Sequence, residues 1–304
     1  MRGGYSLTRS LTVAFLFMEI AQAIVEAAFI LRKAGVAEAR REAGSLLAHT
    51  LGQDRSFLIT HADEVLTDSE LASFREFVMR RAAREPRQYI TGHQEFFGLD
   101  LDVTSDVLIP RPETELLVET ALKLLSEADE PVICDVGTGS GCIAIAMLYQ
   151  RAEARAIGLD ISPAALRVAA RNAARHGVEE RLTLVESDLF AALDPTRPRF
   201  TMVVSNPPYV AGRDFEGLQP EVRDYEPYIA LMPAGSAAAN GLEVIRRLLA
   251  DAPRFLDAQG HLIFEIGFNQ HEAVRELIDP RVWTLLDIHK DLQGIDRTVV
   301  LCKR

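Results

Sequence analysis

The chain has 304 residues, of which 48% are hydrophobic and 25% charged, a composition typical of globular proteins. Its formal net charge is −11, and residues 93–304 carry 21 Lys and Arg against 33 Asp and Glu. This acidity argues against direct nucleic-acid binding, which uses clustered Lys and Arg. No apolar stretch approaches the ~20 residues of a membrane span, so no membrane partner is expected.

Arg2 and Arg9, followed by the apolar stretch Leu11 to Met18, resemble a short signal peptide, with Ala21 to Ala23 as a candidate cleavage site. The apolar pattern nevertheless continues from Ile20 at helical spacing. We therefore interpret residues 1–18 as an N-terminal extension of the folded chain.

A small helical domain is predicted over residues 19–92. Helical periodicity covers residues 20–34 and 37–51, and Thr67-Asp68-Ser69-Glu70 is a capping-box sequence that opens a third helix ending before Pro86. No acid–base or ligand cluster occurs in it. Its expected role is recognition of a partner.

Residues 93–110 are predicted to link this domain to the rest of the chain through a β-hairpin over 96–103 that turns around Gly98. The stretch LIPRPETE, residues 108–115, then introduces a helix. Pro112 suits its first position, and the acidic residues that follow suit the positive end of its dipole. Arg111 has no such structural explanation and is a candidate substrate-binding residue.

Residues 111–304 alternate apolar strands with helices, the rhythm of a doubly wound, mostly parallel sheet. The class predicted is therefore α/β with a small all-α domain before it. Ligands of such sheets bind outside the carboxyl ends of the strands. Seven strands are expected, over residues 132–136, 155–160, 182–186, 200–205, 261–266, 283–289 and 298–302.

The fourth of these strands stops at Asn206-Pro207-Pro208-Tyr209. Proline cannot donate to a sheet ladder, so the chain leaves the sheet there with carbonyl groups not engaged in regular structure. Asn206 Oδ1 and the Pro207 carbonyl could together accept both hydrogens of one planar NH2 group, with the Tyr209 ring covering its face. An isolated Pro-Pro pair is more often only a tight loop.

A glycine-rich turn, Gly137-Thr138-Gly139-Ser140-Gly141, follows the first strand. A dinucleotide fingerprint would need Gly or Ala where this chain has Cys142. Asp160 ends the second strand, where an acid would bind ribose hydroxyls, and Asp188 follows the third. Either acid could merely cap the next helix, although Ser162 is the better cap after Asp160. An acidic crevice of this kind suits a cationic nucleoside such as S-adenosylmethionine.

The sequence strongly resembles the protein-(glutamine-N5) methyltransferases of the PrmC/HemK family, which modify peptide chain release factors. The likeness covers nearly the whole chain after Met18. It is most specific in LIPRPETE together with Ser205 to Tyr209 and the helical N-terminal domain. The other matching stretches are Gln88 to Gly92, Asp135 to Gly141, Asp160 to Pro163, Tyr225 to Pro227, Phe264 to Gly267 and Lys290 to Leu292.

The resemblance implies a Rossmann-like class I methyltransferase sheet and methylation of the GGQ-motif glutamine of class 1 release factors during translation termination. S-adenosylmethionine would be the donor and S-adenosylhomocysteine the product. The implied donor-binding residues are Gly137, Thr138, Gly139, Ser140, Gly141, Asp160, Asp188, Leu189 and Asn206. Asn206, Pro207, Pro208 and Tyr209 would bind the glutamine amide, with Asn206, Pro207 and Tyr209 in the catalytic role. The stretch Met232 to Ala239 departs from the family's shorter glycine-rich loop.

Three alternatives remain open at this level. Adenine-N6 methyltransferases of nucleic acid share the NPPY motif, a non-catalytic module could bind the nucleoside alone, and a dehydrogenase could have the same fold. No metal is expected, because the seven histidines lack paired-ligand spacing. Cys134, Cys142 and Cys302 are an odd number without zinc-like spacing, which indicates free thiols in a reducing compartment, the cytoplasm.

Overall fold

The computed structural model describes residues 18–125, 128–196, 200–232 and 240–304. The signal-like segment before Met18 and nearly all of the loop from Met232 to Ala239 lie outside these residues. The chain divides into two compact units, one ending at Ile90 and the other beginning at Thr91.

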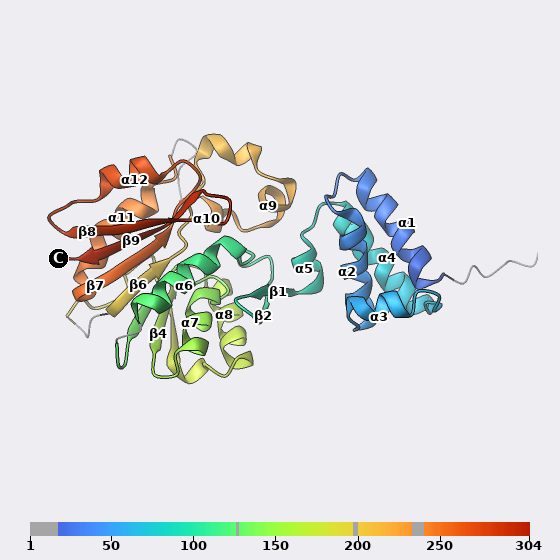
Figure 1. Cartoon of the computed structure of the whole chain (residues 1–304), viewed down its shortest axis with the longest axis horizontal. Helices are drawn as coiled ribbons and strands as arrows, with labels where there is room; N and C mark the ends of the chain where they lie inside the picture. Colours follow the sequence, from blue (N-terminus) through green and yellow to red (C-terminus); the bar gives the residue numbers. More distant parts are fainter. Residues whose placement is uncertain (1–17, 126–127, 197–199, 233–239) are drawn as a thin grey trace, which may run out of the picture. The chain divides into compact units, whose positions relative to one another are not determined.

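The first unit is helical in its described part (Figure 1). Its helices are α1 (Ile20–Lys33), α2 (Ala39–Leu51), α3 (Arg55–Thr60) and α4 (Asp68–Ala82), and α5 (Arg87–Thr91) runs up to the boundary. The three predicted helices correspond to α1, α2 and α4. The short α3 and α5 were not anticipated, because neither is long enough to show a helical period.

The start of α4 follows from its capping box. The Thr67 backbone N–H donates to Glu70 Oε2 at 2.8 Å, and the Glu70 N–H donates to Thr67 Oγ1 at 3.3 Å. Gly52 ends α2 in the left-handed conformation, at φ 61°. The side chains of Leu31, Leu46 and Phe74 are buried between the helices, so this unit has a hydrophobic core of its own.

The second unit contains a seven-stranded sheet in the order β5-β4-β3-β6-β7-β9-β8 (Figure 1). Every pair from β5 to β7 is parallel, and β9 is antiparallel to both β7 and β8. The predicted doubly wound, mostly parallel sheet is confirmed. The strands are β3 (Val132–Val136), β4 (Arg155–Asp160), β5 (Leu182–Glu186), β6 (Phe200–Ser205), β7 (Leu256–Glu265), β8 (Trp283–Lys290) and β9 (Asp296–Lys303).

Three strands differ from their predicted bounds. β8 ends one residue later than predicted, β9 extends beyond residues 298–302 at both ends, and β7 ends one residue earlier, at Glu265. The largest difference is at the start of β7. β7 begins at Leu256 rather than at residue 261, because its register against β6 jumps from Leu256 to His261. The intervening Asp257 to Gly260 is polar and contains Gln259 at φ 61°. A polar bulge of this kind is easily mistaken for a turn before the strand.

Helices cover both faces of the sheet. On one face α6 (Glu115–Leu124), α7 (Cys142–Gln150) and α8 (Pro163–Arg175) share a core with the hairpin. On the other face α11 (Glu243–Asp251) and α12 (His271–Leu277) share a second core, to which none of the described residues of the hairpin contributes. Successive side chains of the central strand β3 point to opposite faces of the sheet. Ile133 therefore packs in the core with α6, α7 and α8, and Cys134 packs in the core with α11 and α12. Shorter turns complete the unit: α9 (Pro220–Tyr225), α10 (Tyr228–Leu231), η1 (Pro112–Thr114), η2 (Glu179–Arg181), η3 (Gly212–Gly217) and η4 (Ala252–Arg254).

The strand order reverses between β3 and β6. From β3 the chain proceeds outward through β4 to β5, then returns to form β6 on the other side of β3. Helices leave the two strands in opposite directions at such a point and open a crevice at the carboxyl ends. The glycine-rich turn follows β3 and Asn206 follows β6, so both sequence motifs lie at this crevice.

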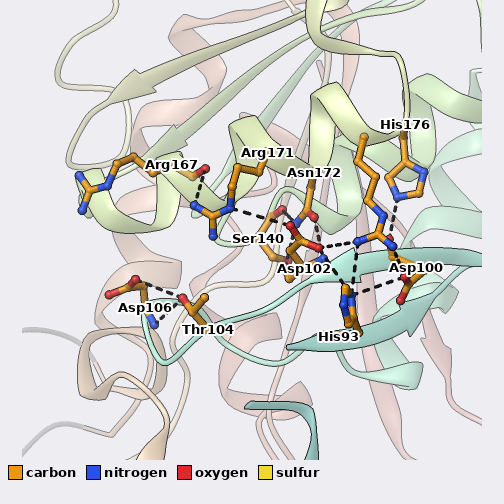
Figure 2. A network of polar contacts seen from close by, with 11 residues as sticks. His93, Asp100, Asp102, Thr104, Asp106, Ser140, Arg167, Arg171, Asn172 and His176 are labelled. Carbon is orange, nitrogen blue, oxygen red and sulfur yellow. Dashed lines mark hydrogen bonds and ion pairs between the residues drawn. The ribbon is translucent and has the colours of Figure 1, made fainter. Parts of the chain in front are cut away.

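The hairpin of β1 (His93–Phe96) and β2 (Leu99–Asp102) belongs to the second unit. Phe97 and Gly98 form its two-residue turn with φ of 52° and 76°, which matches the twist of the paired strands. Figure 2 shows the hairpin fastened to α8 by a polar network. Arg175 contacts both Asp100 and Asp102, and its Nη1 lies 2.6 Å from Asp102 Oδ1.

Asn172 is the buried centre of that network (Figure 2). Its Oδ1 accepts from the Asp102 backbone N–H at 2.7 Å, while Nδ2 donates to the Asp102 carbonyl at 3.0 Å and to the Ser140 carbonyl at 2.9 Å. One side chain therefore connects the hairpin, α8 and the glycine-rich turn. Replacing it leaves three backbone groups without these partners, in one buried and two partly buried hydrogen bonds.

Asn172→Ala is expected to lower the free energy of unfolding of the second unit by about 2 to 4 kcal/mol, because of those unpaired groups. Trp283, the only tryptophan of the chain, is buried in β8 and reports this transition by its fluorescence in a urea titration. Arg167→Ala, at an exposed position of the same helix, is the control and should change stability by less than about 0.5 kcal/mol. Equal losses in the two variants would contradict the role of Asn172.

Candidate active site

The glycine-rich turn between β3 and α7 is bound to the end of β4. The backbone N–H groups of Gly137 and Thr138 both donate to the Leu159 carbonyl, at 2.8 and 2.9 Å. Gly139 has φ 56°, and a Cβ atom there would meet nothing closer than 4.0 Å. The turn thus places open space directly against its backbone, which a ligand can approach closely.

Gly141 has a different role from the other glycines. It has φ 82°, and a Cβ atom at this position would lie 2.8 Å from Ile145 and 3.2 Å from Ala169. It also does not line the cavity described below. Gly141 therefore permits the close packing of α7 against α8, and the structure places it behind the crevice.

Asp135 lies beneath the turn and is completely buried. Its Oδ2 accepts from Thr138 Oγ1 at 2.7 Å and from the Ala144 N–H at 3.3 Å. Burial raises the pKa of this carboxyl to about 7, against the opposing effect of the two hydrogen bonds. Asp135 supports the turn and the first residues of α7 from below, and does not line the crevice.

Asp160, at the end of β4, is already engaged by the backbone. Its Oδ2 accepts from the Gly139 N–H at 2.8 Å and Oδ1 from the Ser162 N–H at 2.9 Å. Ser162 caps α8 as expected, by accepting from the Ala165 N–H. Each carboxylate oxygen retains a further lone pair, so Asp160 can still accept from a ligand hydroxyl while it holds the turn in place.

The turn after β5 is strained at Leu189, whose φ is 49°. Ser187 holds it there: its hydroxyl donates to the Leu189 carbonyl at 2.7 Å and accepts from the Ala192 N–H at 3.0 Å. Such conformations persist only where the surroundings impose them, often at binding sites. Asp188 contacts Arg247 of α11, with Oδ2 and Nη2 2.9 Å apart.

These elements line a cavity of about 210 Å³, which we call the first cavity. The half-exposed Ile161 and Leu189 give it an apolar wall, and Asp160 lies at its polar side. Asn206 and Pro208 close the end toward β6. The other predicted residues that line it are Arg111, Gly137, Thr138, Gly139, Ser140 and Asp188.

A second cavity, of about 460 Å³, shares Asn206 with the first. Pro207 and Tyr209 line it, together with Glu265 of β7 and Arg297 of β9. Asn206 lines both cavities, and so do Leu108, Arg111 and Ala230. The NPPY segment is therefore the boundary across which contents of the two cavities can meet.

The backbone of Tyr209 is fixed from two sides. Gln270 Nε2 donates to its carbonyl at 3.0 Å, and a Cβ atom at Gly241 would lie only 2.2 Å from the same oxygen. Any side chain at Gly241 would displace this segment. Ser205, one residue before Asn206, donates its hydroxyl to the Val136 carbonyl at 2.7 Å and ties the end of β6 to that of β3.

Sequence reasoning missed two residues behind Asn206. Thr114 Oγ1 accepts from Asn206 Nδ2 at 3.1 Å and donates to Glu265 Oε2 at 2.6 Å. Glu265 Oε1 accepts from the Tyr209 hydroxyl at 3.0 Å. Burial raises the pKa of Glu265 and that of Tyr209, whose hydroxyl also faces the Glu265 charge. The available signal was an acid that ends the otherwise apolar strand from Leu262 to Phe264.

Arg111 lines both cavities and pairs with a buried acid. Its Nη2 lies 2.6 Å from Oε1 of Glu226, which is only 1% exposed at its side chain, whereas the Arg111 side chain is 30% exposed. Burial raises the pKa of Glu226, and the charge of Arg111 opposes that shift. A guanidinium held at one edge keeps further donors for a ligand carbonyl or carboxylate.

Two kinds of feature were not found in the described ranges. No cluster of His, Cys, Asp and Glu side chains among these residues is arranged to hold a metal ion. Within the same residues, no helix combines the length and hydropathy needed to cross a membrane.

Comparison with known proteins gives two matching family models, a PrmC N-terminal domain over residues 22–92 and a methyltransferase small domain over residues 112–219. Three similar curated proteins carry the name release factor glutamine methyltransferase. They come from Geobacter sulfurreducens (44% identity, covering 88% of this chain and 91% of the relative), Burkholderia pseudomallei (45%, 84% and 89%) and Koribacter versatilis (40%, 93% and 98%).

Asp135 predicts a pH dependence of stability. The pKa of Asp135 is about 7 in the folded protein and near 3.8 in the unfolded chain. Between pH 3.8 and 7 the folded state therefore binds more protons than the unfolded state. The stabilising contribution of Asp135 is complete below pH 4 and is lost as pH rises through 7. From pH 5 to 8, wild type should therefore lose on the order of 2 kcal/mol more stability than Asp135→Asn, which cannot titrate. Urea titrations followed by Trp283 fluorescence measure this, and parallel losses would contradict it.

Proposed function

This chain belongs to the family of release factor glutamine methyltransferases, and on that basis we propose that it transfers a methyl group from S-adenosylmethionine to the side-chain amide nitrogen (N5) of a glutamine in peptide chain release factors. The proposed acceptor is the GGQ-motif glutamine of class 1 release factors. The shared name of the relatives favours this activity over adenine-N6 methylation of nucleic acid.

The observation that carries the proposal is the meeting of the two cavities at Asn206. Methyl transfer needs the donor carbon and the acceptor nitrogen in contact and in line. A donor in the first cavity and a glutamine side chain in the second would meet beside the NPPY segment. Neither would have to cross the sheet or displace an element of regular structure.

The residues that line the first cavity support S-adenosylmethionine as its ligand. The open space above Gly139 admits a ligand against the backbone, Asp160 is an acceptor for ribose hydroxyls, and Ile161 and Leu189 form an apolar wall for a base. Gly137, Thr138, Ser140 and Asp188 would complete this site, and Gly141 would support it from behind. When bound, S-adenosylmethionine supplies an activated methyl group on a sulfonium.

Asn206 and Pro207 would then orient the glutamine amide. An amide nitrogen is a poor nucleophile because its lone pair is delocalised into the carbonyl. Acceptance of its two N–H groups by Asn206 Oδ1 and the Pro207 carbonyl would direct that lone pair toward the first cavity and stabilise the positive charge that develops on nitrogen. The Tyr209 ring and Pro208 would hold the amide plane in place.

Arg111 would bind a carbonyl of the substrate chain near the junction of the cavities, where Glu226 holds its guanidinium. The helical domain, residues 19–92, would recognise the body of the release factor, because it matches the family's N-terminal domain and contributes no residue to either cavity. The free thiols of Cys134, Cys142 and Cys302 accord with activity in the reducing cytoplasm.

The direct test is methylation with labelled S-adenosylmethionine. The chain is incubated with a purified class 1 release factor or, separately, with duplex DNA, and mass spectrometry locates the label. We expect it on the glutamine of the GGQ motif. Label on adenine, or on other release-factor residues only, would overturn the proposal.

Two single variants should separate donor binding from methyl transfer. Asp160→Ala removes the ribose acceptor and should weaken donor binding by about 10-fold or more, since an unpaired buried hydroxyl costs about 1 to 3 kcal/mol. Asn206→Ala should instead lower the single-turnover rate by about 10²-fold or more, as loss of one preorganised hydrogen bond in a transition state typically does. Asn206→Asp, which keeps an acceptor oxygen, should lie between alanine and wild type.

Calorimetry gives the donor affinities, and single turnovers with saturating donor and release factor give the rates. Asp257→Ala, at the exposed start of β7, is the matched control and should change neither quantity. Near wild-type turnover of Asn206→Ala would mean that NPPY is only a tight loop. Unchanged donor affinity of Asp160→Ala would remove Asp160 from the donor site.

Deletion of the helical domain should affect the protein substrate alone. A fragment of residues 93–304 keeps every residue of both cavities, so its donor affinity should equal that of the full chain. Its rate with subsaturating release factor should fall by about 10-fold or more, because the lost contacts contribute only to docking. Methylation of intact release factor by this fragment at the full rate would refute the docking role.

A further inference from the structure

The inference concerns the hydrogen bonds behind Asn206. The Glu265 carboxylate ends β7 and is buried, and both its oxygens accept from hydroxyl groups of the site. One hydroxyl belongs to Thr114, which is itself 2% exposed, and the other to Tyr209. Burial raises the pKa of this carboxyl, and the hydrogen bonds from the two hydroxyls and the positive charge of Arg297 oppose that shift, while the charge of Glu113 adds to it. With both oxygens accepting from hydroxyls, the geometry is that of the ionised carboxylate.

The direction of these hydrogen bonds follows from counting protons. The Thr114 hydroxyl has one hydrogen, which it donates to Glu265 over 2.6 Å. Toward Asn206 it can therefore only accept, and the group of Asn206 that faces it must be the NH2, over 3.1 Å. The amide oxygen of Asn206 must then point the other way.

We propose that Glu265 and Thr114 are positioning residues that set the orientation of the Asn206 amide, so that Asn206 presents an acceptor and not a donor to the substrate NH2 group. This rests on the proposed function. Rotation of the Asn206 amide by half a turn would place its NH2 against the NH2 of the substrate, where neither can accept. Through its second oxygen, the same carboxylate holds the Tyr209 hydroxyl and with it the ring.

Stability alone does not account for this arrangement. A buried carboxylate loses its hydration, and well-packed apolar residues in its place are often neutral or stabilising. The neighbouring strand also tolerates an unpaired group, because Thr298, opposite Glu265 on β9, has a buried hydroxyl without a partner in the described part of the chain. Glu265, in contrast, accepts at each of its oxygens from a hydroxyl that belongs to the site.

We call the hydrogen bonds from Asn206 through Thr114 to Glu265 the relay. The first test removes the Thr114 hydroxyl from this relay and keeps the shape of the side chain. Thr114→Val replaces the hydroxyl by a methyl group, so Asn206 can take either orientation, and the single-turnover rate should fall by about 10-fold or more with donor affinity unchanged. Thr114→Ser keeps the hydroxyl and should recover most of the rate. Thr298→Val makes the same replacement in the adjacent strand and should retain the wild-type rate.

The second test reverses the direction of the relay. In Glu265→Gln the new NH2 group can donate to Thr114, which lets the threonine proton turn toward Asn206 and stabilise the wrong orientation. In Asn206→Asp the new carboxylate oxygen and the Thr114 hydroxyl oxygen face each other without a hydrogen between them, because the Thr114 hydroxyl donates its one hydrogen to Glu265. Combined, the two substitutions restore a continuous chain from the new amide through Thr114 to the new carboxylate. The double variant should therefore transfer methyl groups faster than either single variant.

The outcomes separate this inference from the proposed function. Wild-type turnover of Thr114→Val, or a double variant that is not faster than both single variants, overturns the relay. In either case a large loss in Asn206→Ala would leave the proposed function intact. Urea titrations of each variant exclude unfolding as the cause of a lower rate. A rate loss in Thr114→Val that serine does not relieve also overturns the inference.

Discussion

The functional region depends on the pairing of β3 with β6. These strands are distant in the chain, yet they are neighbours at the centre of the sheet, and the Ser205 hydroxyl holds their carboxyl ends together through the Val136 carbonyl at 2.7 Å. The glycine-rich turn leaves one strand and the NPPY segment leaves the other. Because helices diverge from such a reversal of strand order, a crevice opens there, and both cavities form around the residues that follow these two strands.

Buried acids support this crevice from behind. Asp135 holds the glycine-rich turn, Glu265 holds Thr114 and Tyr209, and Glu226 holds Arg111. None is placed to act as a strong base, and each accepts from a group that lines or supports a cavity. The proposed reaction would place a cationic donor here and develop positive charge on nitrogen, and preorganised acceptors of this kind would favour it, since they need not reorganise. The loss of stability caused by burying them is the corresponding cost.

The second unit also connects its periphery to this centre. Asn172 joins the Asp102 backbone in the hairpin to the Ser140 carbonyl in the glycine-rich turn (Figure 2). Arg175 adds charge contacts to Asp100 and Asp102. The residues that follow the hairpin, Asp106 to Leu108, line the first cavity. The side-chain amide of Asn172 thus links the hairpin to the glycine-rich turn.

Sequence alone determined the elements and where the chemistry lies along the chain. β3, β4, β5 and β6 have the predicted bounds, because apolar runs ended by glycine, acid or proline are local signals. The same reasoning identified Gly137 to Gly141 and Asn206 to Tyr209 as the segments at the strand ends. Tertiary structure alone decided how their atoms are used. Asp160 is engaged by two backbone N–H groups, Gly141 packs between helices, and Thr114, Asn206 and Glu265 form one relay. Asn206 and Glu265 follow Thr114 by 92 and 151 positions, and a hydrogen bond over such a separation depends on the order of strands, which no local pattern of residues encodes.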